Sequence, residues 1–313
     1  MATVLTDDLK LLSDEAEIVA VGSRSLDKAR AFAAEHAIRN AYGDYLSLVA
    51  DPEVDVVYVS SPHNDHLGSS RLALEAGKAV LCEKPLTVSY EQTRELVDLA
   101  RSRNLFLMEA VWMRTNPIMR KAAELVHSGE LGPVRHASAQ FGFSFDGDDA
   151  HRLLNPDLAG GGILDLGVYP AHAVDLFLGE PAEVRAAGSR LHTGVDGNAT
   201  ALLVYPATDD RLAATATVHC TLESSLDVRL EVLCRDGRIE IGFFIKPEQM
   251  QVWRAGEDEP ETFQTQLSGR GYTFQLQEVH RCLRSGELET PLVPWASTLG
   301  VARTLDAWMA GVR

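Results

Sequence analysis

The first third of the chain alternates short apolar runs with amphipathic segments, and this alternation limits the fold more than any other feature. The apolar runs predict four buried strands, at 17–22, 54–60, 79–82 and 106–110. Helices are expected between them, at 26–36, 45–50, 66–76 and 90–103. Strands that alternate with helices are joined by right-handed crossovers, so the sequence predicts a Rossmann-like parallel sheet covered by helices.

The pattern changes after Trp112. One helix is expected at 118–128, and stretches rich in β-formers then predict strands at 134–145, 184–191, 199–205, 212–222, 226–234 and 239–241. The pair Asp236-Gly237 indicates a hairpin between the last two strands. Helices at 272–285 and 295–309 close the chain. We therefore expect two domains, 1–111 and 112–313, the second an α+β domain with an open, mostly antiparallel sheet.

Charge and composition exclude several classes of protein. The 313 residues include 45 acidic and 29 basic side chains, a net charge of −16, so we expect no nucleic-acid partner. No apolar run approaches the roughly 18–20 residues of a membrane span, and Asp7 and Asp8 near the start do not suit a secretory signal. The four cysteines form no C-x-x-C pair, so we expect reduced thiols, no metal site and a cytoplasmic protein.

The carboxyl ends of parallel strands are where ligands bind in open sheets, so the residues that follow the strands are the first candidates. Ser23, Arg24 and Lys28 follow the first apolar run. A basic residue with a hydroxyl suits the 2′-phosphate of NADP better than the ribose hydroxyls of NAD. NADP(H) is therefore the expected cofactor, with NAD(H) as the second choice. A solvated loop arginine is the alternative interpretation of Arg24.

Two further strand ends carry polar residues. Ser61, Pro62, His63 and His66 follow the second predicted strand and are expected to border the cofactor, although polar loop residues look the same in a sequence. The third strand ends in Glu83-Lys84-Pro85. A glutamate and a lysine at a buried strand end are costly unless they have a role, so both are candidate cofactor residues. A residue before proline is held extended, and such a peptide bond can be cis.

Three motifs carry a resemblance to a known family. They are Lys-Ala-Val-Leu-Cys-Glu-Lys-Pro at 78–85, Leu-Phe-Leu-Met-Glu-Ala-Val-Trp-Met-Arg at 105–114, and Gly-Gly-Gly-Ile-Leu-Asp-Leu-Gly-Val-Tyr-Pro at 160–170. With them the chain resembles the Gfo/Idh/MocA family, and most of all its branch of dimeric dihydrodiol dehydrogenases and NADP-dependent D-xylose dehydrogenases. The resemblance implies NAD(P), hydride transfer at a CH–OH carbon of a sugar, polyol or cyclic diol, and a homodimer formed through the second domain's sheet.

The resemblance also implies the site. Lys84 and Tyr169 are the expected catalytic residues, and helical spacing places Asp165, Tyr169 and His172 on one face. A phenol has an ordinary pKa near ~10, which a nearby Lys84 ammonium would lower toward working pH. Which of Lys84 and Tyr169 carries the proton stays open. Asp165 and His172 are expected to hold substrate hydroxyls.

Two more residues complete the expected pocket. Trp112 and Arg152 are expected to shape it, although core packing accounts equally well for Trp112. Thr115 and Asn116 stand where the branch usually has aromatic residues before a proline. A pocket tuned to aromatic diols is therefore less expected.

The start of the chain departs from the family. The sequence contains no G-x-G-x-x-G turn, and residues 1–9 read as the middle of a first helix, so we expect the first strand to be missing. Its loss would leave two inner strand edges unpaired. A misassigned start codon, a fragment and a degenerate member are the three explanations, of which the first two are favoured.

Rival functions follow from the same features. One is a non-enzymatic relative that senses a nucleotide or a sugar, and another is a truncated, inactive form with impaired cofactor binding. The missing Gly-rich turn favours both, whereas the intact residues Glu83, Lys84, Asp165 and Tyr169 favour an enzyme. An aldose–aldose oxidoreductase that keeps its cofactor bound is the enzymatic rival.

Overall fold

The computed structural model describes residues 2–209 and 212–313, which form two compact units. The first unit comprises the chain up to Thr87, Glu91–Ala110 and Leu267–Trp295, and the second comprises Val88–Tyr90, Val111–Gln266 and Ala296–Arg313. Sequence analysis had assigned the segment 267–295 to the second domain. It belongs to the first unit because its backbone and side chains bond to β5 (Leu107–Ala110): Leu107 N–H donates to Leu288 O, and Trp295 Nε1 donates to Leu107 O.

The strands of the first unit form two separate parallel sheets. One pairs β1 (Ala20–Gly22) with β2 (Asn40–Tyr42), and the other has the order β3 (Val56–Val59), β4 (Ala79–Glu83), β5. The predicted parallel, Rossmann-like arrangement is confirmed. Strand β2 was not predicted, since Asn-Ala-Tyr is too short to show a periodic pattern.

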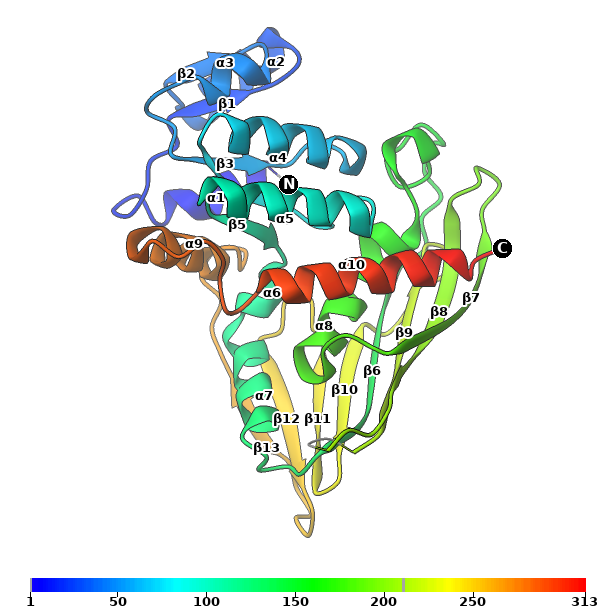
Figure 1. Ribbon diagram of the computed structural model, residues 1–313. Helices are drawn as coiled ribbons and strands as arrows, with labels where there is room; N and C mark the ends of the chain where they lie inside the picture. Colours follow the sequence, from blue (N-terminus) through cyan, green and yellow to red (C-terminus); the bar gives the residue numbers. More distant parts are fainter. Residues whose placement is uncertain (1, 210–211) are drawn as a thin grey trace. The chain divides into compact units, whose positions relative to one another are not determined.

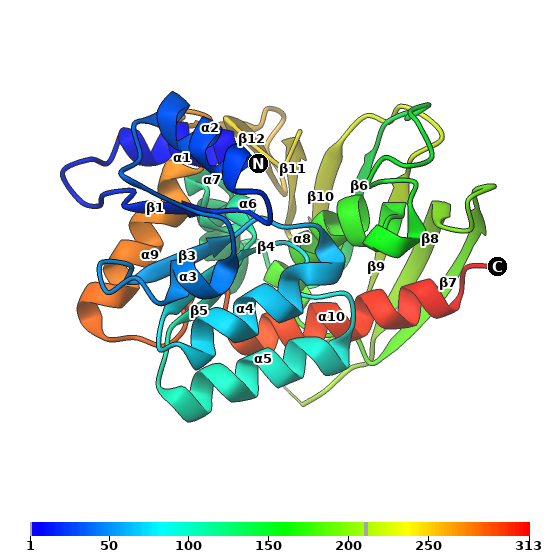
Figure 2. The ribbon, with the colours of Figure 1, turned by 90° about the horizontal axis from the view of Figure 1, so that it is seen from above.

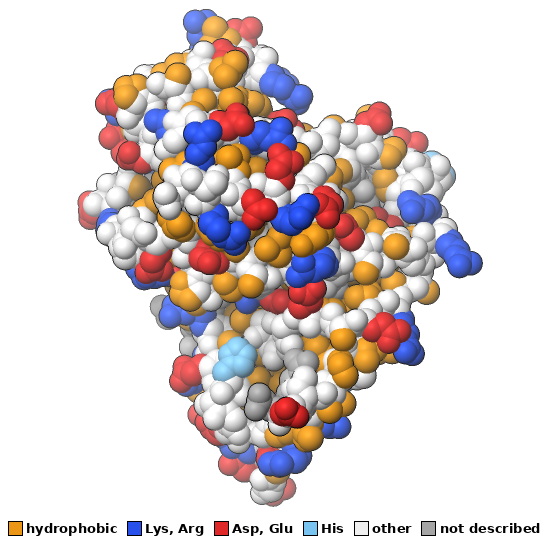
Figure 3. Space-filling view, in the orientation of Figure 1, with side chains coloured by type: hydrophobic (Ala, Val, Ile, Leu, Met, Phe, Trp, Pro, Cys, Tyr) orange, Lys and Arg blue, Asp and Glu red, His pale blue; other side chains and the backbone are white. Residues whose placement is uncertain are grey.

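Helices connect the strands of the first unit. They are α1 (Ala2–Lys10), α2 (Leu26–His36), α3 (Tyr45–Val49), the 3₁₀ turn η1 (His63–Asp65), α4 (His66–Glu75), α5 (Tyr90–Arg103) and α9 (Thr273–Ser285). The bounds of α2 agree with the prediction because Ser25 caps the amide of Lys28 and Ala37 ends the helix in the left-handed conformation, at φ +58°. Acidic and basic side chains lie side by side over α4 and α5 (Figure 3), where Arg71 pairs with Glu95.

Helix α1 confirms the helix predicted over residues 2–9, while Met1 lies outside the described residues, and it is tied to the start of α9. Asp8 is 1% exposed. Its carboxylate accepts the backbone N–H of Arg270 at 2.8 Å and of Tyr272 at 2.8 Å. A buried carboxylate needs hydrogen-bond donors, and here two backbone N–H groups supply them. These bonds fix α1 against the segment that follows residue 267.

The second unit is built on one open sheet of eight strands, whose order is β13-β12-β11-β10-β6-β9-β8-β7 (Figure 1). Only β6 and β9 run parallel, so the expected open, mostly antiparallel sheet is confirmed. The hairpin at Asp236-Gly237 is also confirmed, because Cys234 pairs with Gly237. The strands are β6 (Val134–Gly142), β7 (Glu183–Arg190), β8 (Asp196–Tyr205), β9 (Ala214–Thr221), β10 (Arg229–Cys234), β11 (Gly237–Gly242), β12 (Gln249–Arg254) and β13 (Glu261–Gln264).

One face of this sheet is covered by helix. The helical segments are α6 (Trp112–Thr115), α7 (Pro117–His127), the 3₁₀ turn η2 (Pro156–Leu158), the π-helical turn η3 (Ile163–Gly167), α8 (Val168–Leu178) and α10 (Trp295–Ala310). Helix α8 packs on β6 and β9, whose inward residues Ala137, Ala139, Ala216 and Val218 are small and fully buried. Small side chains let the helix approach the sheet closely, so the core of this unit lies under α8.

Within the described ranges 2–209 and 212–313, no helix is long and apolar enough to cross a membrane.

Candidate functional site

The carboxyl end of β1 opens into a short basic turn. Ser23 and Arg24 follow the strand, and Lys28 lies in the first turn of α2. The side chains of Arg24 and Lys28 are exposed, while Ser23 Oγ accepts the N–H of Ser25 at 3.3 Å. Two exposed cationic side chains next to a helix N-terminus can bind an anionic group.

The carboxyl end of β3 is joined to the end of β4 through a buried histidine. His66 lies between two carbonyl groups, with Nδ1 2.8 Å from Pro85 O and Nε2 2.9 Å from Ser61 O. His63 lies one turn earlier, with its ring centroid 5.5 Å from that of His66, and Pro62 precedes it. Burial lowers the pKa of His66 despite its two carbonyl neighbours. His66 therefore connects the segments that follow β3 and β4.

Glu83 and Lys84 lie buried at the end of β4, and the peptide bond between Lys84 and Pro85 is cis. Glu83 Oε1 accepts the phenol O–H of Tyr58 at 2.5 Å. Burial raises the pKa of Glu83, against the opposite effects of Tyr58 and Lys84. Sequence analysis missed Tyr58, because a tyrosine inside an apolar strand reads as ordinary core.

A second carboxylate supports the same turn. Glu109 lies on β5, is buried, and accepts the backbone N–H of Leu86 at 3.0 Å. The signal in the sequence was a charged residue inside the apolar run 106–110, which core packing alone does not explain. Glu109 therefore fixes the backbone that immediately follows Lys84 and Pro85.

In the second unit, a tyrosine and a tryptophan share a hydrogen bond. Tyr169 lies on α8 and is 6% exposed. Trp112, at the start of α6, donates its Nε1–H to Tyr169 Oη at 2.8 Å. A donor directed at a phenol oxygen stabilises the phenolate form, so this contact suits a tyrosine that exchanges its proton. It also assigns Trp112 a definite partner, which sequence analysis did not foresee.

Asp165 forms an ion pair in the same unit. Arg152 Nη1 lies 2.7 Å from Asp165 Oδ1, and the arginine is about half exposed whereas the aspartate is buried. Asp165 belongs to the π-helical turn η3, and the α-helix begins only at Val168. The sequence-based helical spacing, which started an α-helix at Asp165, is therefore wrong for this turn. His172 lies on α8 and is completely buried.

The turn before Asp165 is held by a residue that sequence analysis missed. Asp196 on β8 is buried, and its Oδ2 accepts the N–H of Ile163 at 2.6 Å. Gly161 has φ +121°, and a Cβ atom there would lie 2.2 Å from Asp196 Oδ1. Only glycine fits at this position. In the sequence, Asp196 is marked only as an aspartate close to a β-rich segment, and this is a weak indication of a structural role.

A buried ion pair supports the helices that carry Trp112 and Tyr169. Arg114 on α6 donates from Nη1 to Asp175 Oδ2 on α8 at 2.7 Å and to Ser297 Oγ on α10 at 2.5 Å. Both charged side chains are almost completely buried, so breaking one partner would leave an uncompensated charge. This pair fixes α6 against α8 and thereby supports the Trp112–Tyr169 contact.

A line of aromatic rings leads away from Tyr169. The ring centroid of Phe141 lies 5.7 Å from that of Tyr169, 6.2 Å separates Phe141 from Phe143, and 6.5 Å separates Phe143 from Phe145. All three phenylalanines are partly exposed. The line ends at His151, 4.6 Å from Phe145. The backbone N–H of Phe143 donates to Thr221 O at the end of β9, and that of Phe145 donates to Leu222 O just after it, so these bonds hold the line in an extended conformation.

Comparison with known proteins places this geometry in a family. The model of the oxidoreductase family with an NAD-binding Rossmann fold matches residues 2–111, and that of the GFO/IDH/MocA C-terminal domain matches 119–240. The D-xylose 1-dehydrogenase (NADP(+)) of Hypocrea jecorina is 37% identical over 93% of this chain and 82% of its own. The trans-1,2-dihydrobenzene-1,2-diol dehydrogenase of Oryctolagus cuniculus is 36% identical over 93% of this chain and 89% of its own.

A solved structure has a similar fold and a related sequence. It is KijD10, a 3-ketoreductase from Actinomadura kijaniata in complex with NADP and TDP-benzene. It superposes with a TM-score of 0.79 at 29% identity, over 95% of this chain and 90% of that one.

The Gly161 turn yields a stability prediction. Gly161→Ala should lower the free energy of unfolding by roughly 2 kcal/mol more than Gly194→Ala, measured by urea denaturation. Both glycines have positive φ, at +121° and +91°, but nothing lies within 4 Å of a Cβ at Gly194. The control therefore carries the backbone strain without the clash at Asp196. Equal losses in the two variants would show that Asp196 does not hold this turn.

The lowered pKa of His66 yields a pH dependence. Below the ordinary histidine pKa of ~6.5, the unfolded chain binds a proton at His66 that the folded chain does not, so stability should fall as the pH falls. The slope from this one group can reach ~1.4 kcal/mol per pH unit. His66→Gln should remove that slope from urea denaturation curves, whereas His127→Gln, at an exposed position, should keep it. Because the pKa of His219 is also lowered by burial, some slope remains in every variant, but a slope in His66→Gln as steep as in the parent chain contradicts the assignment.

Proposed function

Because the chain belongs to the GFO/IDH/MocA family of oxidoreductases, we propose that it transfers a hydride between NADP(H) and a CH–OH carbon of a sugar, polyol or cyclic diol. The observation that carries the proposal is the phenol of Tyr169, which receives a hydrogen bond from Trp112 and lies two residues after the turn η3, whose Asp165 pairs with Arg152. Relatives named as NADP-dependent xylose and dihydrobenzene-diol dehydrogenases support the substrate class.

The residues after β1 fit the nucleotide in part. The exposed cations of Arg24 and Lys28, with the hydroxyl of Ser23, suit the 2′-phosphate of NADP(H) and favour it over NAD(H). Ser61, Pro62, His63 and His66 follow β3, and Glu83 and Lys84 follow in the next strand; we assign these residues to the border of the same nucleotide site. The described residues contain no Gly-rich turn for the pyrophosphate. When bound, the nicotinamide ring supplies or accepts the hydride.

Proton transfer is assigned to Tyr169 and Lys84. The phenol of Tyr169 donates its proton to the substrate oxygen during reduction and takes it back during oxidation, while Trp112 Nε1–H stabilises the phenolate. Lys84, which directly follows β4, is assigned as the second catalytic residue. We assign residues 1–111 to nucleotide binding and 112–313 to substrate binding and dimerisation.

The substrate is held by the second unit. We assign Asp165 and His172 to the binding of substrate hydroxyls, while Arg152 balances the charge of Asp165. The rings of Phe141, Phe143 and Phe145 offer an apolar wall for the C–H face of a sugar or the ring of a diol.

The assembly is assigned from the open sheet. Residues of β8 that point away from α8, such as Leu202 and Val204, are apolar and half-exposed. A second copy packed on this face would cover them, so we assign a homodimer through the sheet of the second unit. The four cysteines are free thiols, which suits a cytoplasmic protein.

A second candidate function is a non-enzymatic relative that senses a nucleotide or a sugar. The specific observation in its favour is the division of the first unit into two sheets, which alters the edge where a dinucleotide would lie. A sensor would bind ligand without turnover, and that result separates it from the enzyme and from an aldose–aldose oxidoreductase, which would purify with its nucleotide.

Substitutions in the Tyr169–Trp112 pair test the proposed proton transfer. Tyr169→Phe should lower turnover with NADP⁺ and a panel of aldoses and diols by about 10²–10⁴-fold, because the acid–base group is lost, and should leave NADPH affinity unchanged. Trp112→Phe should shift the pH profile of turnover upward, because the phenolate loses a donor. The readout is the absorbance of NADPH.

Tyr42→Phe is the matched control, since it removes a tyrosine hydrogen bond to Asp51 elsewhere in the chain. It should leave turnover as it is. Unchanged turnover in Tyr169→Phe, or an unchanged pH profile in Trp112→Phe, would contradict the assignment of the proton to Tyr169.

A further inference from the structure

Titratable side chains gather at the carboxyl ends of two neighbouring strands of the first unit. Tyr58 lies on β3, Glu83 is the last residue of β4, and Lys84 follows it directly. Glu83 and Lys84 are only 5% and 8% exposed. A buried charge is costly unless hydrogen bonds or opposite charges balance it. The partners of Glu83 therefore matter for the charge that Lys84 meets.

The strand register places Tyr58 and Glu83 on one face of their sheet. Tyr58 pairs with Leu81, and every second residue of a strand points to the same face. Cys82 points to the other face and pairs there with Glu109 of β5. The carboxyl groups of Glu83 and Glu109 therefore lie on opposite faces, so Glu83 has to find its partners on the face of Tyr58.

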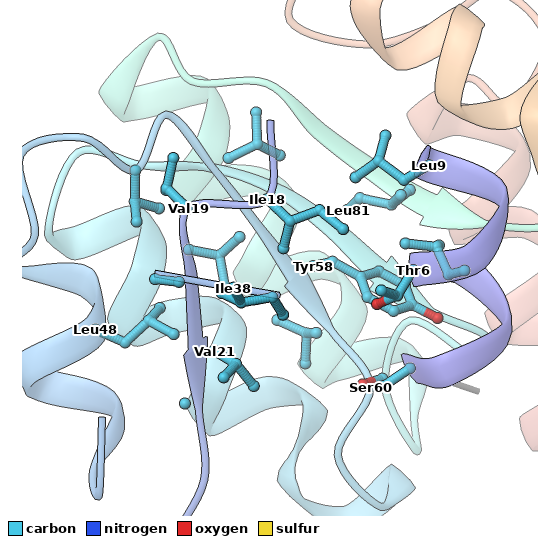
Figure 4. A pocket seen from close by; sticks show the side chains of 18 of the residues that line it. Thr6, Leu9, Ile18, Val19, Val21, Ile38, Leu48, Tyr58, Ser60 and Leu81 are labelled. Atoms are coloured by element: carbon cyan, nitrogen blue, oxygen red, sulfur yellow. The ribbon is translucent and has the colours of Figure 1, made fainter. Parts of the chain in front are cut away.

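Helix α1 covers the face on which Tyr58 lies. Figure 2 shows α1 on the opposite side of these strands from α4 and α5, and Figure 4 shows the ring of Tyr58 beside Thr6 of α1. Burial, together with the charge of Glu83, raises the pKa of Tyr58. The phenol therefore keeps its proton at neutral pH and acts as a hydrogen-bond donor.

One hydrogen bond joins the two side chains. Tyr58 Oη donates to Glu83 Oε1 at 2.5 Å, a length typical of a hydroxyl group bonded to an ionised carboxylate. A donor of this kind favours the carboxylate over the neutral acid. Burial raises the pKa of Glu83, whereas the bond from Tyr58 and the charge of Lys84 lower it. Removal of the phenol would therefore allow Glu83 to take up a proton at a higher pH.

Other titratable groups surround this pair on the elements packed against it. They are Asp8 on α1, His66 on α4, Cys82 on β4, Glu109 on β5 and Tyr272 just before α9. Asp8 and Glu109 accept backbone N–H groups, and His66 lies between two carbonyl groups. Tyr58 differs from these three, because its side chain donates directly to Glu83.

We propose that Tyr58 is a positioning residue, whose phenol holds Glu83 in place as a carboxylate beside Lys84. The carboxylate balances the charge of the Lys84 ammonium in a site with little access to water. Tyr58 acts through Glu83 and needs no contact with the substrate. The inference rests on the proposed function, because it takes Lys84 as a catalytic residue.

Removal of the phenol oxygen tests the inference without reading activity. Tyr58→Phe keeps the ring and loses the donor, and Tyr42→Phe is the matched control, since Tyr42 donates to Asp51 in the same unit at 2.9 Å. The pH at which Glu83 takes up a proton is followed by infrared difference spectroscopy, through the C=O band of the carboxylic acid. Glu83→Gln identifies this band, because the variant lacks it.

Tyr58→Phe should raise the midpoint of this titration by about 1–2 pH units, because a hydrogen bond to a charged group is lost. Tyr42→Phe should leave the midpoint where it is. An unchanged midpoint in Tyr58→Phe overturns the inference, and so does an equal shift in both variants.

The pH profile of turnover separates positioning from support of the fold. With NADP⁺ and a panel of aldoses and diols, the acid limb of kcat in Tyr58→Phe should move upward by the same interval, and turnover at high pH should approach that of the parent chain. Turnover reduced by one factor at every pH indicates a merely structural role and overturns the inference. If the titration midpoint moves but the parent chain turns over no substrate, the proposed function fails, and the positioning role with it.

A second substitution covers the case in which Tyr58→Phe does not fold. Incorporation of 3-fluorotyrosine in place of Tyr58 keeps the ring and the hydroxyl group, and the fluorine makes the phenol a stronger donor. The titration midpoint of Glu83 should then fall below that of the parent chain. A midpoint that stays the same or rises overturns the inference.

Discussion

Hydrogen bonding between parallel strands is the constraint on which the first unit depends. Each inner strand of such a sheet requires a partner on both edges, because a buried backbone group without one is costly. Strands β1 and β3 each have a described partner on one edge only, and their open edges line one cavity. The carboxyl ends of the same strands carry the candidate nucleotide residues Ser23, Arg24 and Ser61.

The second unit holds the phenol of Tyr169 in a fixed place. Tyr169 lies on α8, which follows the turn held by Asp196 and is anchored through the Arg114–Asp175 pair. Neither contact touches the phenol, but both limit the movement of the helix that bears it. The hydrogen bond from Trp112 then fixes the phenol oxygen itself. Positioning by several buried polar contacts is what an acid–base group requires, since proton transfer depends on close geometry.

Much of the fold could be predicted from the sequence, and the exceptions have physical causes. The bounds of α2 and α5 could be predicted from helical periodicity and from the residues that end helices. The long strands β8 and β9 could be predicted because apolar and polar residues alternate along them. Strand β2, the edge strand β13 and its neighbour β12 escaped prediction because short or polar segments show little periodicity. Residues near strand ends, such as Lys84, could be singled out because a charge there is costly. Asp196 and Tyr58 could not, since their roles arise from contacts between segments distant in the chain.

The most direct test of the account is a titration of the full chain with NADPH and with NADH, followed by intrinsic tryptophan fluorescence. The account predicts that NADPH binds at least about tenfold more tightly than NADH, a difference of ~1.4 kcal/mol, and that Arg24→Ala abolishes this preference. Equal affinities for the two nucleotides, or a preference that survives in Arg24→Ala, would contradict the assignment of the basic turn after β1. Absence of binding by either nucleotide would contradict the proposed oxidoreductase activity of this chain.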